Sequence, residues 1–148
     1  MPNKKIKNAT PLEYMGIKFK SKLEMSAYAT LKEAGLPVKY EPRRFILWDG
    51  FKPTVPFFNK NRITRALKQD SKKILPISYT PDFVFNYKGY MIVIEAKGLE
   101  NEVFPIKRKM FRGWLERNCP NSLYFEVFSK KHVEQAIDII KNLKQCTK

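Results

Sequence analysis

Apolar and polar positions alternate with a period of two between Tyr79 and Leu99, which predicts two strands joined by a turn. In the first predicted strand, Asp82 shares a face with Val84. In the second, Glu95 shares a face with Lys97. Pairing of the two strands can therefore place Asp82, Glu95 and Lys97 on one side of a small sheet.

Helical periodicity marks three other segments. Ser21 and Glu24 have the spacing of a capping box, which predicts a helix that ends at Gly35. A second helix is expected over 103–118 and a third over about 130–144. The apolar stripe of the second helix consists of Ile106, Met110, Phe111, Trp114 and Leu115. That of the third consists of Val133, Ala136, Ile137, Ile140 and Leu143.

Short apolar runs predict the remaining strands. We expect strands over 15–19, 38–47 and 123–128, and Pro42 indicates an edge position or a bulge in the second of these. The element order is then α-β-(insertion)-β-β-α-β-α, without repeats. This order predicts an α/β sandwich around a mixed central sheet, in a single domain that spans residues 1–148. Residues 1–15 are basic and weakly patterned, as in an arm.

The insertion at about 49–77 mixes aromatic, proline and basic residues and follows neither periodicity. A short helix is expected near Asn61–Gln69. Basic residues interleaved with aromatic ones can hold a phosphate backbone and stack bases. A hairpin whose aromatic residues pack on the core, with its lysines in water, gives the same pattern, and both interpretations stay open. The candidate DNA-binding residues of this segment are Lys60, Arg62 and Arg65.

The amino-acid composition indicates what kind of partner the protein binds. The 148 residues include 29 basic and 14 acidic side chains, and the net charge of +15 favours a polyanionic partner over a merely soluble basic surface. No apolar run approaches the roughly 18–20 residues of a membrane span. The basic N-terminus lacks the apolar segment of a secretory signal, and the two cysteines make no disulfide framework. We expect a cytoplasmic protein without a membrane partner.

The residues Asp82, Glu95 and Lys97 suggest metal-assisted chemistry. Two carboxylates suit a hard divalent cation such as Mg²⁺, which can polarise a phosphate and activate a water. Lys97 can orient that water or neutralise charge that develops on the phosphate. The alternative is that these three residues are ordinary charged side chains on an exposed face of the sheet. The apolar run before Glu95 favours a site, because a charged residue that ends a buried strand is a common position for one.

The pattern Pro81-Asp82 with Glu95-Ala96-Lys97 resembles the motif of the PD-(D/E)xK nuclease superfamily. The stretches at 19–24, 35–36, 39–41, 80–83 and 95–99 are similar in order and spacing to the phage endonuclease I family, which resolves four-way (Holliday) junctions. The resemblance implies a restriction-endonuclease-like core and Mg²⁺ as cofactor, with Mn²⁺ as a substitute. It also implies branched DNA as substrate, a homodimer, and Glu24 as a further active-site acid and metal ligand.

The segment with Phe104 and Lys107–Phe111 resembles a family of uncharacterised phage-encoded PD-(D/E)xK proteins. Lys107 and Arg108 lie one turn into this helix, and the co-facial Asp82, Glu95 and Lys97 together with the net positive charge lead us to expect that they contact the scissile or an adjacent phosphate. One position departs from the endonuclease I pattern: Lys39 stands where that family has an additional acid, and Glu41 follows two residues later. The predicted function is a Mg²⁺-dependent endodeoxyribonuclease, with a nuclease for duplex or nicked DNA and a non-catalytic DNA-binding module as alternatives.

Overall fold

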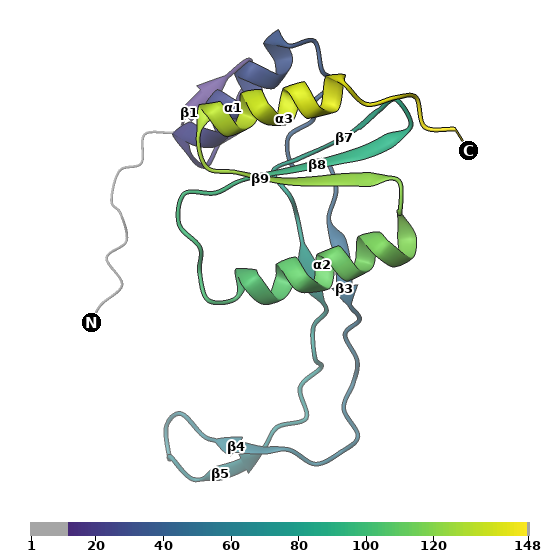
Figure 1. The fold of residues 1–148 in the computed structure, drawn as a ribbon. Coiled ribbons are helices and arrows are strands. Elements are labelled where there is room, and N and C mark those ends of the chain that lie inside the picture. Colours follow the sequence, from purple (N-terminus) through teal and green to yellow (C-terminus); the bar gives the residue numbers. More distant parts are fainter. Residues whose placement is uncertain (1–11, 148) are drawn as a thin grey trace.

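A mixed three-stranded sheet forms the centre of the protein in the computed structural model, which describes residues 12–147. Its strands are β7 (Phe83–Tyr87), β8 (Tyr90–Ala96) and β9 (Ser122–Val127). Strand β8 pairs antiparallel with β7 and parallel with β9 (Figure 1). Lys88 and Gly89, with φ of 49° and 84°, form the tight turn between β7 and β8. The strand pair expected between Tyr79 and Leu99 is therefore confirmed, although its first strand begins only at Phe83.

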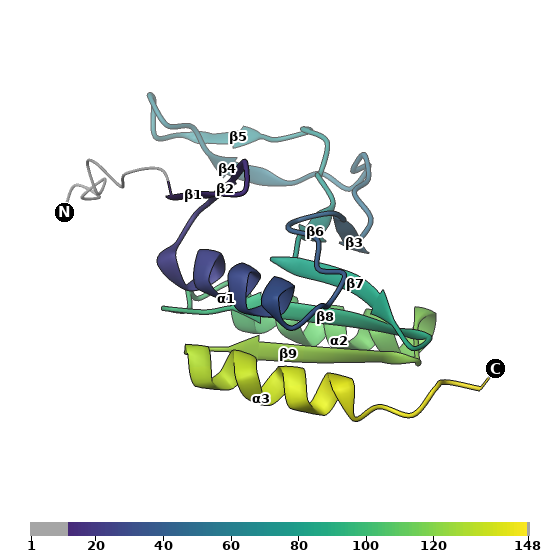
Figure 2. The ribbon, with the colours of Figure 1, turned by 90° about the horizontal axis from the view of Figure 1, so that it is seen from above.

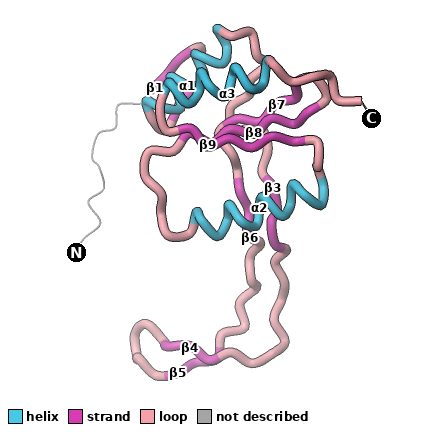
Figure 3. Tube along the Cα trace, in the orientation of Figure 1, coloured by secondary structure: helices cyan, strands magenta, loops and turns pink. Residues whose placement is uncertain are grey.

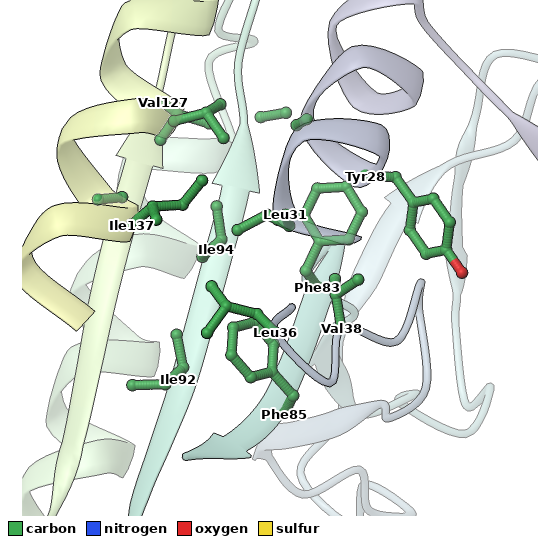
Figure 4. Close-up of a cluster of buried hydrophobic side chains, with 14 of the residues drawn as sticks. Tyr28, Leu31, Leu36, Val38, Phe83, Phe85, Ile92, Ile94, Val127 and Ile137 are labelled. Carbon is green, nitrogen blue, oxygen red and sulfur yellow. The ribbon is translucent and has the colours of Figure 1, made fainter. Parts of the chain in front are cut away.

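Helices cover both faces of this sheet, as expected of an α/β protein. They are α1 (Lys22–Glu33), α2 (Phe104–Asn118) and α3 (Lys130–Lys141). Phe83, Ile92 and Ile94 pack into the core beneath α1 and α3, which lie side by side (Figures 2 and 4). Val84 and Val93 face the opposite way, toward α2. The period of two in these strands therefore separates two cores. No helix of the described residues is both long and apolar enough to cross a membrane.

Helix α1 begins and ends where its capping residues predict, whereas α3 begins as expected at Lys130 but ends at Lys141, short of the expected end near residue 144. The Ser21 hydroxyl accepts a hydrogen bond from the Glu24 backbone N–H at 3.1 Å, and Gly35 takes a φ of 77° after the last turn of α1. Ser129 caps α3 in the same way as Ser21. The predicted stripe of α3 is confirmed, with Val133, Ala136, Ile137 and Ile140 buried and Leu143 packed against the same core.

The predicted apolar stripe of α2 is wrong at Ile106. This side chain is 60% exposed, whereas Phe104, Phe111 and Leu115 are buried. Positions 104, 111 and 115 are seven and four residues apart, so they share one face of the helix, and Ile106 points away from it. This orientation of α2 matters for the site, because Phe104 and Lys107, three residues further on, lie beside Glu95 at the end of the sheet.

The N-terminal part of the described chain is a hairpin of β1 (Leu12–Tyr14) and β2 (Ile17–Phe19). Met15 and Gly16, both with positive φ, form its turn. The strand expected over 15–19 is therefore shorter than predicted. Residues 1–11 of the predicted basic arm lie outside the described residues, and its last part belongs to β1.

The strand expected over 38–47 is reduced to β3 (Phe45–Trp48), which pairs antiparallel with β6 (Ile77–Tyr79). Before β3, only a single bridge joins Tyr40 to Phe83 of the central sheet. Pro42 lacks a backbone N–H and Glu41 has a φ of 44°, so a regular ladder cannot run through this segment.

The insertion is an extended arm rather than a helix. Its hairpin consists of β4 (Phe58–Lys60) and β5 (Leu67–Gln69). The arm projects from the body on two long loop segments (Figures 1 and 3). The helix expected over Asn61–Gln69 is wrong because the Asn61 side chain accepts from the backbone N–H groups of Ile63 and Thr64 and turns the chain. Phe57 and Phe58 are 58% and 57% exposed, so the aromatic residues of the arm do not pack on the core.

Candidate active site

Two buried carboxylates face each other at one end of the central sheet. Asp82 directly precedes β7 and Glu95 lies in β8, next to the paired residues Phe83 and Ile94. The Asp82 backbone N–H lies 3.4 Å from Glu95 Oε2, and the Ala96 N–H donates to Asp82 Oδ2 at 2.8 Å. Both carboxylates are 7% exposed. The strand register thus holds two acids together where solvent is scarce.

The environment of Asp82 strongly disfavours its charged form. Burial raises the pKa of the Asp82 carboxyl to about 8, and the negative charge of Glu95 adds to this effect. The charges of Glu24 and Glu41 raise the pKa further, whereas the hydrogen bond from the Ala96 N–H lowers it. Three other acids, Glu95, Glu24 and Glu41, therefore act on Asp82. A bound cation would relieve the repulsion between these charges.

Lys97 is the cation that lies closest to this pair. Its Nζ is 3.1 Å from Glu95 Oε1 and 3.3 Å from the centre of the Phe104 ring, the distance of a cation–π contact. The side chain is consequently held between a carboxylate and an aromatic face. The structure thus brings together Asp82, Glu95 and Lys97, as the alternation of the two strands predicts.

Glu24 approaches the pair from the first turn of α1. Its Oε2 accepts hydrogen bonds from the Tyr40 hydroxyl at 2.7 Å and the Lys20 N–H at 3.2 Å, and its Oε1 accepts from the Ser21 hydroxyl at 3.0 Å. Glu24 thus completes the cap of the helix. Its charge also acts on Asp82, although no hydrogen bond joins the two side chains.

Tyr79 is a site residue that the sequence does not single out. Its hydroxyl donates to Glu95 Oε2 at 2.6 Å and lies 3.2 Å from the Tyr124 hydroxyl. Burial and the charge of Glu95 raise the pKa of Tyr79 far above its usual value, so it remains a protonated donor. The only signal in the sequence is its place three residues before Asp82. Glu41 also acts on Asp82 and pairs with Lys20, and its only signal in the sequence is its place two residues after Lys39, where the family pattern has an acid.

A cleft of about 330 Å³ opens beside Glu95. Lys107 forms part of its wall, as does Phe104. Arg108, predicted to contact phosphate with Lys107, instead donates to Glu126 Oε2 at 2.9 Å and also pairs with Glu100. These carboxylates raise the pKa of Arg108 and engage its guanidinium. Of the two predicted phosphate contacts, only Lys107 therefore reaches the cleft. The full lining is Ser78, Tyr79, Thr80, Glu95, Asn101, Val103, Phe104 and Lys107.

The other predicted DNA-binding residues lie elsewhere. Lys60, Arg62 and Arg65 belong to the β4–β5 hairpin, which Figure 1 shows well separated from β8 and α2. Of the five predicted basic residues, Lys107 thus lies at the carboxylate cleft, Arg108 is paired with acids, and three lie on the arm.

The donor set fits a hard cation such as Mg²⁺, which prefers oxygen ligands and often binds through one or two carboxylates, with waters completing its shell. Asp82 Oδ1 accepts no hydrogen bond from a described residue. Since no fully buried side-chain oxygen of residues 12–147 lacks a partner, this oxygen reaches solvent. Within the same residues, no three His, Cys, Asp or Glu side chains are gathered closely enough to enclose a metal. The arrangement therefore fits a partly hydrated ion and not a closed protein cage.

Fold and site together define a mixed α/β protein with a buried acidic site at the end of its central sheet. Residues 4–127 match the family described as "Protein of unknown function (DUF1064)", and the chain belongs to this family. No curated protein and no solved structure matches the chain. Its function must therefore be argued from the site itself.

Proposed function

We propose that the protein is a Mg²⁺-dependent DNA endonuclease of the PD-(D/E)xK type that acts on branched DNA. The observation that carries this proposal is the buried pair of Asp82 and Glu95, in contact with Lys97 and beside a cleft lined by Lys107. Two carboxylates pressed together cost stability unless a cation or a proton offsets their repulsion. Such an arrangement is typical of a functional site. The restriction-endonuclease-like core is part of the same proposal.

Each residue of the site has a defined part in this proposal. Asp82 and Glu95 would hold Mg²⁺, with Mn²⁺ as a substitute, and Tyr79 orients Glu95 through its hydrogen bond. A bound Mg²⁺ polarises the scissile phosphate and lowers the pKa of the attacking water. Lys97, fixed against Phe104, orients that water, and Lys107 binds a phosphate oxygen in the cleft. Glu24 acts on the metal site from the start of α1.

The substrate and assembly follow from charge and from the resemblance to junction resolvases. A net charge of +15 favours DNA, whose phosphates bind Lys and Arg with release of counterions. A four-way junction has two-fold symmetry, so a nuclease that cuts it in a paired manner is expected to be a homodimer. We place this activity in the cytoplasm of the host cell, as expected of a phage-encoded enzyme.

Cleavage of labelled DNA in the presence of Mg²⁺ tests the proposal. Four-way junction, nicked duplex, linear duplex and single strands of matched sequence should be compared, and the junction should be cut fastest. Asp82→Asn and Lys97→Ala should each lower the single-turnover rate by on the order of 100-fold or more, because the first weakens a metal ligand and the second removes the positive charge beside the attacking water. Asp138→Asn and Lys141→Ala, two exposed positions of α3, are the matched controls and should retain the rate.

Two outcomes would change the conclusion. Full cleavage by Asp82→Asn or Lys97→Ala would show that the site is assigned wrongly. Equal rates on linear duplex and junction would favour a nuclease without junction selectivity.

A non-catalytic DNA-binding module is the second candidate. It is favoured by the observation that no three metal-ligating side chains are gathered together in the described residues. Tight DNA binding without cleavage of any substrate, in Mg²⁺ or Mn²⁺, would support this alternative.

A further inference from the structure

The β4–β5 hairpin carries charge of one sign only. Its residues 58–69 include four basic side chains and no acidic one. The basic residues are Lys60, Arg62, Arg65 and Lys68. All four are exposed, at the far end of the arm (Figure 1). Two such hairpins would repel each other, so the charge argues against a second copy at this tip and for a polyanion.

The turn of the hairpin, residues 61–66, presents one large apolar side chain, Ile63, which is 90% exposed. The turn that carries it is built by hydrogen bonds. Asn61 Oδ1 accepts from the N–H groups of Ile63 at 2.8 Å and Thr64 at 3.0 Å, and the Asn61 carbonyl accepts from the Arg65 N–H at 3.0 Å. Arg65 takes a φ of 66° to close the turn. Ile63 is thus held outward, between two arginines, where it contributes nothing to either core.

We propose that the arm binds duplex DNA and that Ile63 is a wedge, which enters a base step from the minor groove and kinks the duplex. Arg62 and Arg65 then bind the phosphates on either side of that step. Isolated apolar side chains are used in this way by proteins that bend DNA, with basic residues around them. The inference rests on the proposed function only in taking DNA as the partner; it requires no catalysis.

The arm is connected to the carboxylate site through its stem. Strand β6 ends at Tyr79, whose hydroxyl contacts Glu95, and Asp82 follows three residues later. Near the base of the arm, its outgoing and returning segments run so close together that a Cβ on Gly50 would lie 2.4 Å from the Ile74 carbonyl oxygen. Ile63 and Tyr79 are sixteen positions apart in sequence, which limits the distance from tip to cleft to about 58 Å. One DNA molecule can therefore contact both.

Base unstacking and bending, measured without divalent cation so that no cleavage occurs, test the wedge. Duplexes of about 40 bp with 2-aminopurine beside a central TA step, the kind of step most easily kinked, report unstacking. End-to-end energy transfer reports the bend. Binding of the wild-type protein should raise 2-aminopurine fluorescence and shorten the end-to-end distance. Ile63→Ser should lose most of both signals, with a change in Kd below about tenfold.

Val55→Ser is the matched control, because Val55 is also an exposed β-branched residue of the arm, 79% exposed, but lies outside the hairpin. It should keep both signals. The wedge is overturned if Ile63→Ser gives the wild-type signals, or if Val55→Ser loses them equally. It is also overturned if Ile63→Ser converts a dimer into a monomer in sedimentation without DNA, since the tip is then a protein interface.

The test separates this inference from the nuclease proposal. Cleavage that depends on Asp82, together with an unbent and fully stacked duplex, would leave the nuclease in place and remove the wedge. A kink that depends on Ile63, with no cleavage of any substrate in Mg²⁺, would keep the wedge and remove the nuclease.

Discussion

Asp82 occupies a position in which its charged form lowers the stability of the folded protein. Its carboxyl is buried next to Glu95, and the negative potential of Glu24 and Glu41 also acts on it. A structural role alone would be served better by an amide, which carries no charge. The acid is nevertheless held by a backbone hydrogen bond from Ala96, so its orientation is maintained in spite of the repulsion.

This repulsion should appear in the pH dependence of stability. The pKa of Asp82 is raised from 3.8 to about 8 on folding, so between these values the folded protein keeps a proton that the unfolded chain releases. The contribution of Asp82 to the free energy of unfolding therefore falls as pH rises through this range, and the loss is complete above about pH 8. Without divalent cation, Asp82→Asn should be more stable than wild type near pH 9, by on the order of 2 kcal/mol, and much closer to it near pH 4.

Urea denaturation at a series of pH values measures this effect. Asp138→Asn, at an exposed position of α3, is the control and should follow the wild-type profile. Parallel profiles for Asp82→Asn and wild type would contradict the assignment of the raised pKa to Asp82.

At the scale of the element, the first turn of α1 combines a cap and an acid. Ser21 and Glu24 form the capping box, and Glu24 also reaches the Tyr40 hydroxyl and acts on Asp82. Sequence alone could not separate the two roles. Two substitutions can, because one removes the cap and leaves the charge, while the other removes the charge and leaves most of the hydrogen bonds.

Ser21→Ala should lower the free energy of unfolding by about 1 kcal/mol and leave the cleavage rate within a few fold of wild type. Glu24→Gln should change stability less than this, but it should lower the cleavage rate by on the order of 10- to 100-fold, because a charge is lost beside the proposed metal site. Urea denaturation and single-turnover cleavage provide the two readouts. A Glu24→Gln variant with the wild-type rate would reduce Glu24 to a helix cap.

The elements that periodicity predicted well are those whose two faces meet different environments. Strands β7 and β8 lie between two cores, and α3 lies with one face on the sheet, so their patterns are regular. The predictions failed where a local contact or a neighbouring element decided the outcome. Asn61 bonds the backbone of its own turn and prevents a helix, and burial of Phe104 turns Ile106 outward.

The basic residues proposed to bind DNA lie in two separate regions of the molecule. Lys107 lines the cleft beside Glu95, whereas Lys60, Arg62 and Arg65 lie on the arm. If both regions bind one DNA, phosphate contacts on the arm add to the electrostatic part of binding without touching the chemistry. The arm should then govern affinity and its dependence on salt.

Each of three single substitutions on the arm, Lys60→Ala, Arg62→Ala and Arg65→Ala, removes one phosphate contact. Each should therefore lower the magnitude of the slope of log K for DNA binding against log [salt] by about 1. Fluorescence anisotropy with labelled duplex across a salt series measures the slope. Lys141→Ala is the control, with an exposed lysine of α3 removed. Unchanged slopes for all three arm variants would show that the arm does not bind phosphate.

The sequence by itself determined the pair at the centre of the site. Strand residues alternate between faces, and the short turn at Lys88 and Gly89 fixes a register in which Asp82 and Glu95 share a side. It also determined the start of α1, because the capping pair of Ser21 and Glu24 lies only three positions apart. Both results follow from local geometry that does not depend on the rest of the fold.

Only the tertiary structure decided what surrounds that pair. Three contacts join different elements of the fold. Tyr79 donates a hydrogen bond to Glu95, Lys97 lies over the ring of Phe104, and Arg108 donates to Glu126. The burial that raises the pKa of Asp82 is likewise a property of the packed protein. These contacts arise when separate elements meet, and no short-range pattern encodes which side chains will then be neighbours.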